Sequence, residues 1–174
     1  SSELVSLVEA NPHSGNVRSL LKDEDEHTFN HSVDVSQYVI SACHIMKGIG
    51  GKKLAAIAVG ALLHDIGKSK LPRSLLTTPG TFNAQDKELM RQHPVLGAEI
   101  LSGLGYTSLQ IDMARHHHVT RLGGYPKYDY NKVTNLARLT GISDIFQALT
   151  TNRPYKDSEL PNVALQTLLK LAKT

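Results

Sequence analysis

An all-α domain of about seven helices is the fold that this sequence predicts. Apolar residues recur at helical spacing in several segments, and no segment shows the convincing apolar–polar alternation of a half-buried strand. Residues suited to begin or end helices lie between these segments. Only 5% of the chain is aromatic and Trp is absent, so the core should consist of Leu, Ile, Val and Ala. The length of 174 residues fits one domain.

The N-terminal half contains two strong helical patterns. Residues 1–26 are polar and partly acidic, and we expect a helical or linker segment there, before a domain that covers 27–174. Residues 27–47 carry apolar side chains at helical spacing and end at a group of glycines. Residues 53–66 are apolar on nearly every face, which predicts a buried helix that ends at Gly67.

Capping residues predict where the later helices begin. We expect a loop over 73–82 and then a helix that Asn83 caps. Pro94 suits the first turn of the next helix, and Thr107 with Gln110 has capping-box spacing for the helix after it. The remaining predicted elements are a loop over 119–131 and helices over 132–151 and 158–173.

Composition limits the class of protein. The net charge of +3 and the pI near 9.0 favour an anionic ligand but do not require a nucleic-acid polymer, and we expect none. Cys43 is the only cysteine, which excludes an internal disulfide and fits a reducing cytosol. No apolar run reaches the roughly 18 residues of a membrane span. We therefore expect a cytoplasmic protein, and we expect this chain to be a fragment of a longer one.

Histidines and aspartates lie in unusually apolar surroundings. His64 and Asp65 end the most apolar predicted helix, and Asp144 lies among apolar residues of the helix predicted over 132–151. Burying a bare carboxylate is costly, so such groups are paired or bind metal. Neutral imidazole and carboxylate are ligands of first-row transition metals. Taken singly, each residue also fits a structural role as a core histidine or an ion-pair partner.

Several ordered motifs identify a family. His31, the pair His64–Asp65, and Asp144 resemble the HD superfamily of metal-dependent phosphohydrolases. The longer run is more specific, and it resembles the HD-GYP family of cyclic di-GMP phosphodiesterases over residues 27–172. The motifs that carry this resemblance are HDIGK at 64–68, Pro72, HPVLGAEIL at 93–101, HH at 116–117, GYP at 124–126 and ALTTNRPYK at 148–156.

The resemblance implies a site with two transition-metal ions, with iron expected and manganese as the alternative. The ligands implied for the first ion are His31, His64, Asp65 and Asp144. Asp65 would bridge to a second ion, whose further ligands would be His93, His116 and His117. His27 lies one turn before His31, so it could hold a third ion, and a solvated position is the alternative.

The resemblance also implies cyclic di-GMP as the substrate. Hydroxide formed from metal-activated water would cleave the phosphodiester in line, giving linear pGpG and then GMP as a further product. Asp65 and Lys68 are the expected catalytic residues, with Lys68 acting on the phosphate as a point charge. Arg153 either contacts the substrate or caps the long helix. The full set of expected substrate contacts is Lys68, Arg121, Gly124, Tyr125 and Arg153. A regulatory domain outside this chain is a further expected partner.

The loop before GYP departs from the family pattern. The family reads HHExxDGxGYP, whereas this chain reads HHHVTRLGGYP, with His118, Arg121 and Leu122 at the altered positions. Gln147 also stands where the family often has Asp. We expect substrate binding to be kept and catalysis to be weakened. Two alternatives stay open: a cyclic dinucleotide-binding sensor with weak or no catalysis, and an HD hydrolase of another phosphate ester.

Overall fold

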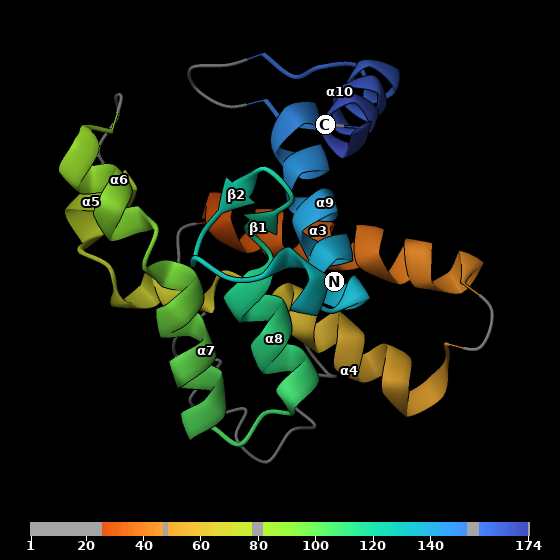
Figure 1. The fold of residues 1–174 in the computed structure, drawn as a ribbon, viewed down its shortest axis with the longest axis horizontal. Coiled ribbons are helices and arrows are strands. Elements are labelled where there is room, and N and C mark those ends of the chain that lie inside the picture. The colour runs from red at the N-terminus through yellow and green to blue at the C-terminus, as the bar shows by residue number, and fades with distance from the viewer. Residues whose placement is uncertain (1–25, 47–48, 78–81, 153–156, 174) are drawn as a thin grey trace.

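The computed structural model is built almost entirely of helices, which confirms the predicted all-α fold (Figure 1). It describes residues 26–46, 49–77, 82–152 and 157–173. Residues 1–25 of the predicted N-terminal segment lie outside this description, and so does Arg153. The side chain of His27 also lies outside the description. The predicted domain boundary therefore stays a prediction.

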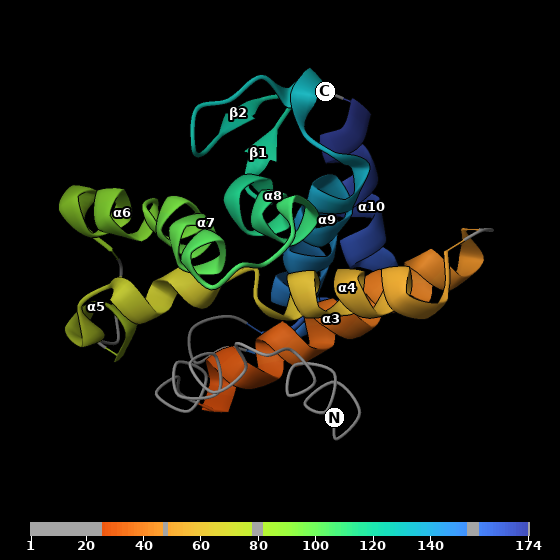
Figure 2. The same ribbon diagram turned by 90° about the horizontal axis from the view of Figure 1, so that it is seen from below.

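Helices from both halves of the chain pack around one centre. Helix α3 lies against α4 and α9, α8 lies against α4, α7 and α9, and α10 covers α9. Figure 2 shows α5 and α6 at the opposite side of the molecule from α10. The elements in chain order are α3 (Glu26–Ile45), α4 (Gly51–Leu62), the 3-10 helix η1 (Ile66–Lys70), α5 (Arg73–Thr77), α6 (Ala84–Met90), α7 (His93–Gly103), α8 (Ser108–His116), β1 (Val119–Thr120), β2 (Gly123–Gly124), the 3-10 helix η2 (Tyr130–Lys132), α9 (Asn135–Thr150) and α10 (Pro161–Lys173).

The three helix starts predicted from Asn83, Pro94 and Thr107 are confirmed, whereas α9 and α10 begin three residues later than predicted. The Asn83 side chain accepts a hydrogen bond of 2.9 Å from the main-chain N–H of Asp86, and the Asp86 carboxylate accepts one in return. Thr107 and Gln110 form the same reciprocal capping box at the start of α8. Pro94 lies in the first turn of α7. These contacts satisfy N–H groups that have no partner inside the helix.

Three local features differ from the sequence prediction. Helix α4 ends at Leu62, so His64 and Asp65 lie in a tight turn between α4 and η1 and not in a helix. Helix α5 occupies part of the segment predicted as a loop over 73–82. A short hairpin, β1 with β2, forms inside the segment predicted as a loop over 119–131. Gly123 and Gly124 permit it, because their φ angles are 121° and 104°.

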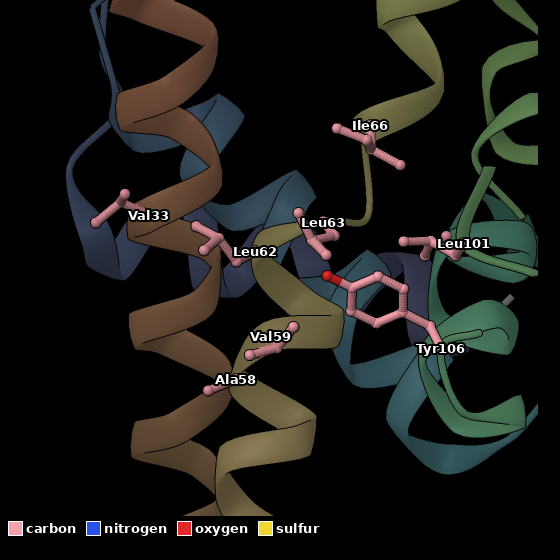
Figure 3. Packing of buried hydrophobic residues seen from close by; sticks show 9 residues of the cluster. Val33, Ala58, Val59, Leu62, Leu63, Ile66, Leu101 and Tyr106 are labelled. Carbon is pink, nitrogen blue, oxygen red and sulfur yellow. The ribbon is translucent and has the colours of Figure 1, made fainter. Parts of the chain in front are cut away.

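The main core lies directly beneath the turn that carries His64 and Asp65. Leu62, Leu63 and Ile66, which flank this pair, are all buried, and Figure 3 shows them between α3 and α7. The apolar anchors on both sides fix the direction in which the turn presents its polar side chains. The buried members of this cluster are Val33, Ala58, Val59, Leu62, Leu63, Ile66, Leu101, Tyr106 and Ala114. In the described part of the chain, no helix combines the length and apolar character needed to cross a membrane.

Candidate metal centre

Imidazole and carboxylate groups from five segments meet beside the core. They form two groups, within each of which the ligand atoms all lie within 4.8 Å of one another. The first group is Asp65, His93, His117 and His118. The second group is His31, His64 and Asp144. His31 lies on α3, His93 in the first turn of α7 and Asp144 on α9, whereas His117 and His118 follow the last residue of α8.

Asp65 lies between the two groups. Its Oδ1 is 3.1 Å from His93 Nε2 and 3.7 Å from His117 Nε2. Its Oδ2 is 3.4 Å from His64 Nε2 and 3.6 Å from His31 Nε2. One carboxylate therefore directs one oxygen to each group, an arrangement compatible with the predicted bridge. The bridging role itself stays a prediction.

Hydrogen bonds fix which ring nitrogen of each histidine is available. The Nδ1 atoms of His64, His93 and His117 donate to main-chain carbonyls at 2.7, 2.7 and 2.8 Å. His31 Nδ1 donates at 2.7 Å to the side-chain oxygen of Gln147. A carbonyl oxygen can only accept, so Nδ1 carries the hydrogen, and in the neutral ring Nε2 keeps a lone pair. Outer partners of this kind orient histidines that bind metals.

The lone pairs converge in a way that calls for a cation. His93 Nε2 and His117 Nε2 are 3.3 Å apart, and this contact is favourable only when a proton or a metal ion lies between them. His64 Nε2 and Asp65 Oδ1 are buried and form no hydrogen bond within the described residues. Buried polar atoms normally have partners. Imidazole and carboxylate donors in this arrangement therefore fit transition-metal ions.

Burial keeps two of the imidazoles neutral. It lowers the pKa of His117 well below its ordinary value, and the charges of His118 and His64 lower it further. Burial also lowers the pKa of His118 to about 4, although the charge of Asp144 opposes the shift. Neutral imidazole is the form that binds a metal, so both rings are suited to that role at neutral pH.

The carboxylates stay ionised despite their burial. Burial alone would raise the pKa of Asp65, but the charges of Lys68 and His64 outweigh it and hold the pKa well below its ordinary value. Asp144 behaves in the same way, because its hydrogen bond with His31 and the charge of His64 lower its pKa against the effect of burial. Burial would lower the pKa of His64, but the charge of Asp65 raises it on balance.

Lys68 reaches the centre from η1. Its Nζ donates a hydrogen bond to Asp65 Oδ2, the oxygen that faces the second group. The Lys68 side chain is 23% exposed, so it lies at the edge of the centre and within reach of solvent. Its predicted role on the substrate phosphate stays a prediction.

The structure separates His116, the last residue of α8, from His118, two residues further along the chain. Among the described residues, His116 belongs to neither group. Its Nδ1 lies 2.6 Å from Asp112 Oδ1, and its ring stacks on Tyr128 with centroids 4.1 Å apart. His118 lies in the first group instead. Sequence reasoning did not name His118 as a ligand, although the run of three histidines was a visible signal.

Comparison with known proteins assigns the chain to a family. The HD domain family matches residues 16–174. The chain belongs to the HD domain family. Known relatives also confirm the resemblance to the HD-GYP family, at about 30–35% identity.

Two curated relatives and one solved structure illustrate the relationship of this HD domain. It is 34% identical over 139 residues to a cyclic di-GMP phosphodiesterase of Pseudomonas aeruginosa, covering 78% of the chain and 33% of that protein. It is 30% identical over 146 residues to 3′3′-cGAMP-specific phosphodiesterase 2 of Vibrio cholerae, covering 82% and 28%. The chain thus spans about a third of the length of these relatives. The HD domain of the Listeria monocytogenes phosphodiesterase PgpH has the same fold, with a TM-score of 0.64, 22% identity and coverage of 88% and 82%.

The GYP segment of the HD domain adjoins the candidate metal centre. Gly124 has a φ of 104°, and a Cβ atom there would lie 2.0 Å from the main-chain oxygen of His118. Only glycine therefore lets the loop approach so closely. The Tyr125 ring lies 4.6 Å from the His118 ring and 6.1 Å from the His93 ring, and burial raises its pKa to about 12. Gly124 and Tyr125 thus adjoin the centre, and their contact with substrate stays a prediction.

A cavity of about 660 Å³, lined in part by Tyr125, lies between α6, α7 and the GYP segment. The Arg91 guanidinium lies 6.0 Å over the Tyr125 ring and 3.6 Å from the Glu88 carboxylate. Within the described ranges, Arg121 is not a lining residue, and its guanidinium lies 5.6 Å from the Tyr130 ring. The lining residues are Glu88, Arg91, Gln92, Val95, Leu96, Gly124, Tyr125, Pro126 and Lys127.

Proposed function

We propose that this HD domain is a phosphodiesterase that hydrolyses cyclic dinucleotides with two transition-metal ions, and that cyclic di-GMP is its substrate. The observation that carries the proposal is the buried carboxylate of Asp65, which presents one oxygen to each group of histidines. The relatives named as cyclic di-GMP and 3′3′-cGAMP phosphodiesterases support the substrate class. The resemblance to the HD-GYP family implies cyclic di-GMP, and relatives named for either substrate match the chain at similar identity.

The two ions would be held by neighbouring sets of donors that share Asp65. One ion, at the second group, would take His31, His64, Asp144 and Asp65 Oδ2. The other ion, at the first group, would take Asp65 Oδ1, His93 and His117, with His116 as the further ligand that the motif predicts. Bound metal ions lower the pKa of water toward neutrality and stabilise negative charge on phosphoryl oxygens. We propose iron, which the family resemblance implies, with manganese as the alternative, since these donors accept both. His27 stays a predicted ligand of a third ion.

The protein's own groups would bind and orient the substrate. Lys68, at the exposed edge of the centre, would hold a phosphoryl oxygen with its charge. The cavity volume falls within the range of small-molecule sites, so it can receive one base of the dinucleotide. Tyr125 would provide a stacking surface there, and Arg91 and Lys127 would contribute positive charge. Arg121 and Arg153 remain predicted contacts.

A sensor that holds the dinucleotide but barely cuts it is the second candidate. The altered loop favours it, because Arg121 and Leu122 stand where the family has Asp and Gly. The positive charge of Arg121 would hold an anion without speeding its hydrolysis. The third candidate, an HD hydrolase of another phosphate ester, shares the same metal centre and differs only in substrate.

Metal analysis combined with turnover tests these candidates. The chain is purified anaerobically, loaded with iron or manganese, and analysed for metal content and for products from cyclic di-GMP, 3′3′-cGAMP, cyclic di-AMP and a panel of other phosphate esters. We expect two ions per chain and the fastest cleavage with cyclic di-GMP. Tight binding without product would favour the sensor. Preferred cleavage of another ester would identify a different HD hydrolase, and absence of both binding and cleavage would refute the proposal.

A further inference from the structure

We propose that His118 is a further ligand in the metal-binding group that contains Asp65, His93 and His117. This inference rests on the proposed metal-binding function and goes beyond it, because the HH motif assigns the ligand pair to His116 and His117. The ligand atoms of His118 and the other three residues all lie within 4.8 Å of one another. Three imidazoles and one carboxylate would then supply four donors to one ion.

His118 lies over the centre in contact with both groups. Its ring centroid is 4.1 Å from that of His117 and 5.1 Å from that of His93. Its Nδ1 is 3.8 Å from Asp144 Oδ2, in the second group. The side chain is 24% exposed, so it closes the solvent side of the centre. A ligand at this place would separate the ions from bulk water and face the incoming substrate.

The GYP segment holds His118 in this position. The main-chain N–H of Tyr125 donates a hydrogen bond of 3.3 Å to the His118 carbonyl. Gly124 allows this approach, because any Cβ atom there would overlap the same carbonyl. The Tyr125 ring lies beside the His118 ring, with the two centroids 4.6 Å apart. The loop therefore fixes both the main chain and the ring of the third histidine in the run.

His116 already has other partners. Its Nδ1 contacts Asp112 Oδ1 at 2.6 Å, and Thr134 donates a hydrogen bond of 2.5 Å to the other carboxylate oxygen of Asp112. Thr134 also caps α9 by accepting from the main-chain N–H of Ala137. With its ring stacked on Tyr128, His116 therefore joins the end of α8 to the start of α9. These contacts engage Nδ1 and the ring face and leave Nε2 available, so they orient His116 for the role that the motif predicts, and His118 is a ligand in addition to it.

Three matched substitutions separate the two histidines: His118→Gln, His116→Gln and, as a control on the exposed side of α3, His44→Gln. The metal-free chains are titrated with Mn²⁺ and with Co²⁺, following bound metal by elemental analysis and ligand geometry by the visible absorption of Co²⁺. We expect His118→Gln to weaken binding of one of two ions by about tenfold or more and to change the Co²⁺ spectrum. His116→Gln should also weaken binding of an ion and, because it loses the contacts with Asp112 and Tyr128, should unfold at lower urea concentration. His44→Gln should match the wild type.

Two results would overturn the assignment while leaving the proposed function intact. One is a wild type and a His118→Gln chain that bind two ions with equal affinity and the same spectrum. The other is loss of an ion from His116→Gln alone, which would restore the pair that the motif predicts. A wild type that binds no second ion overturns both proposals. Because position 118 lies outside the helices, His118→Gln and a second variant, His118→Ala, should keep the helical circular dichroism of the metal-free chain, and ion loss must appear in both.

Discussion

Gly67 lies where η1 passes the first turn of α7, and its replacement tests how packing positions the metal centre. A Cβ atom at residue 67 would lie 2.0 Å from the main-chain oxygen of His93 and 2.4 Å from the nitrogen of Gly97. The first distance must lengthen to about 3.4 Å before the contact becomes ordinary, so η1 and α7 must move apart. His93 and Asp65, whose ligand atoms are 3.1 Å apart, lie on the two segments that separate. We expect Gly67→Ala to destabilise the domain by about 1–3 kcal/mol and to reduce turnover about 100-fold.

Gly103→Ala provides the matched control, because it lies at the other end of α7 and its Cβ atom would meet nothing within 4 Å. It should leave stability unchanged or raise it by up to about 1 kcal/mol. Both variants are compared by urea unfolding of the metal-free chain, by Mn²⁺ titration and by cyclic di-GMP turnover. If Gly67→Ala matches Gly103→Ala in unfolding free energy and in metal affinity, the packing argument is wrong.

Three further predictions address the surroundings of the centre. Gln147→Leu removes the oxygen that accepts a hydrogen bond from His31 Nδ1, so the Mn²⁺ affinity measured by titration should fall about 10–100-fold. An unchanged affinity would show that Gln147 does not orient this ring. The pKa of His118 is lowered to about 4, so as pH falls from about 6.5 to about 4 the unfolded chain gains a proton that the folded chain does not. Metal-free wild type should therefore lose about 3 kcal/mol relative to His118→Gln over that range in urea unfolding, and parallel pH profiles would contradict this. Arg91→Ala should raise KM for cyclic di-GMP several-fold with little change in kcat, whereas the exposed control Lys52→Ala should leave KM unchanged. Equal KM values for Arg91→Ala and the wild type would show that Arg91 does not bind substrate.

Helix starts are predictable from this sequence, whereas the end of α4 is not. Capping is local, so Asn83 and Thr107 reveal helix starts through residues three positions away. The apolar pattern of α4 continues through Ile66, yet the helix ends at Leu62. The tertiary contact of Gly67 with α7 favours the tighter turn there, and nothing within the segment itself signals that contact.

The site shows the same division between local and tertiary information. The motifs name six of the seven residues in the two groups, because those residue types occur at fixed places in the family pattern. They do not name His118, since its place beside the group depends on the direction that the chain takes after the end of α8. Asp112 and Tyr128, which engage His116, and the GYP segment, which holds His118, become partners only in the folded chain. Arg121 likewise suggests a phosphate contact from its charge, but the hairpin directs it to Tyr130.

The most direct test of the central claim, that Asp65 serves two ions at once, is to count metal ions in the wild type and in Asp65→Ala and to measure cyclic di-GMP turnover on the same anaerobic samples. The account predicts two ions per wild-type chain. It predicts that Asp65→Ala lowers metal content and abolishes turnover while circular dichroism shows the helices intact, because one carboxylate faces both groups of histidines. No more than one ion per wild-type chain after reconstitution with excess iron or manganese, or near-normal turnover in Asp65→Ala, would contradict it.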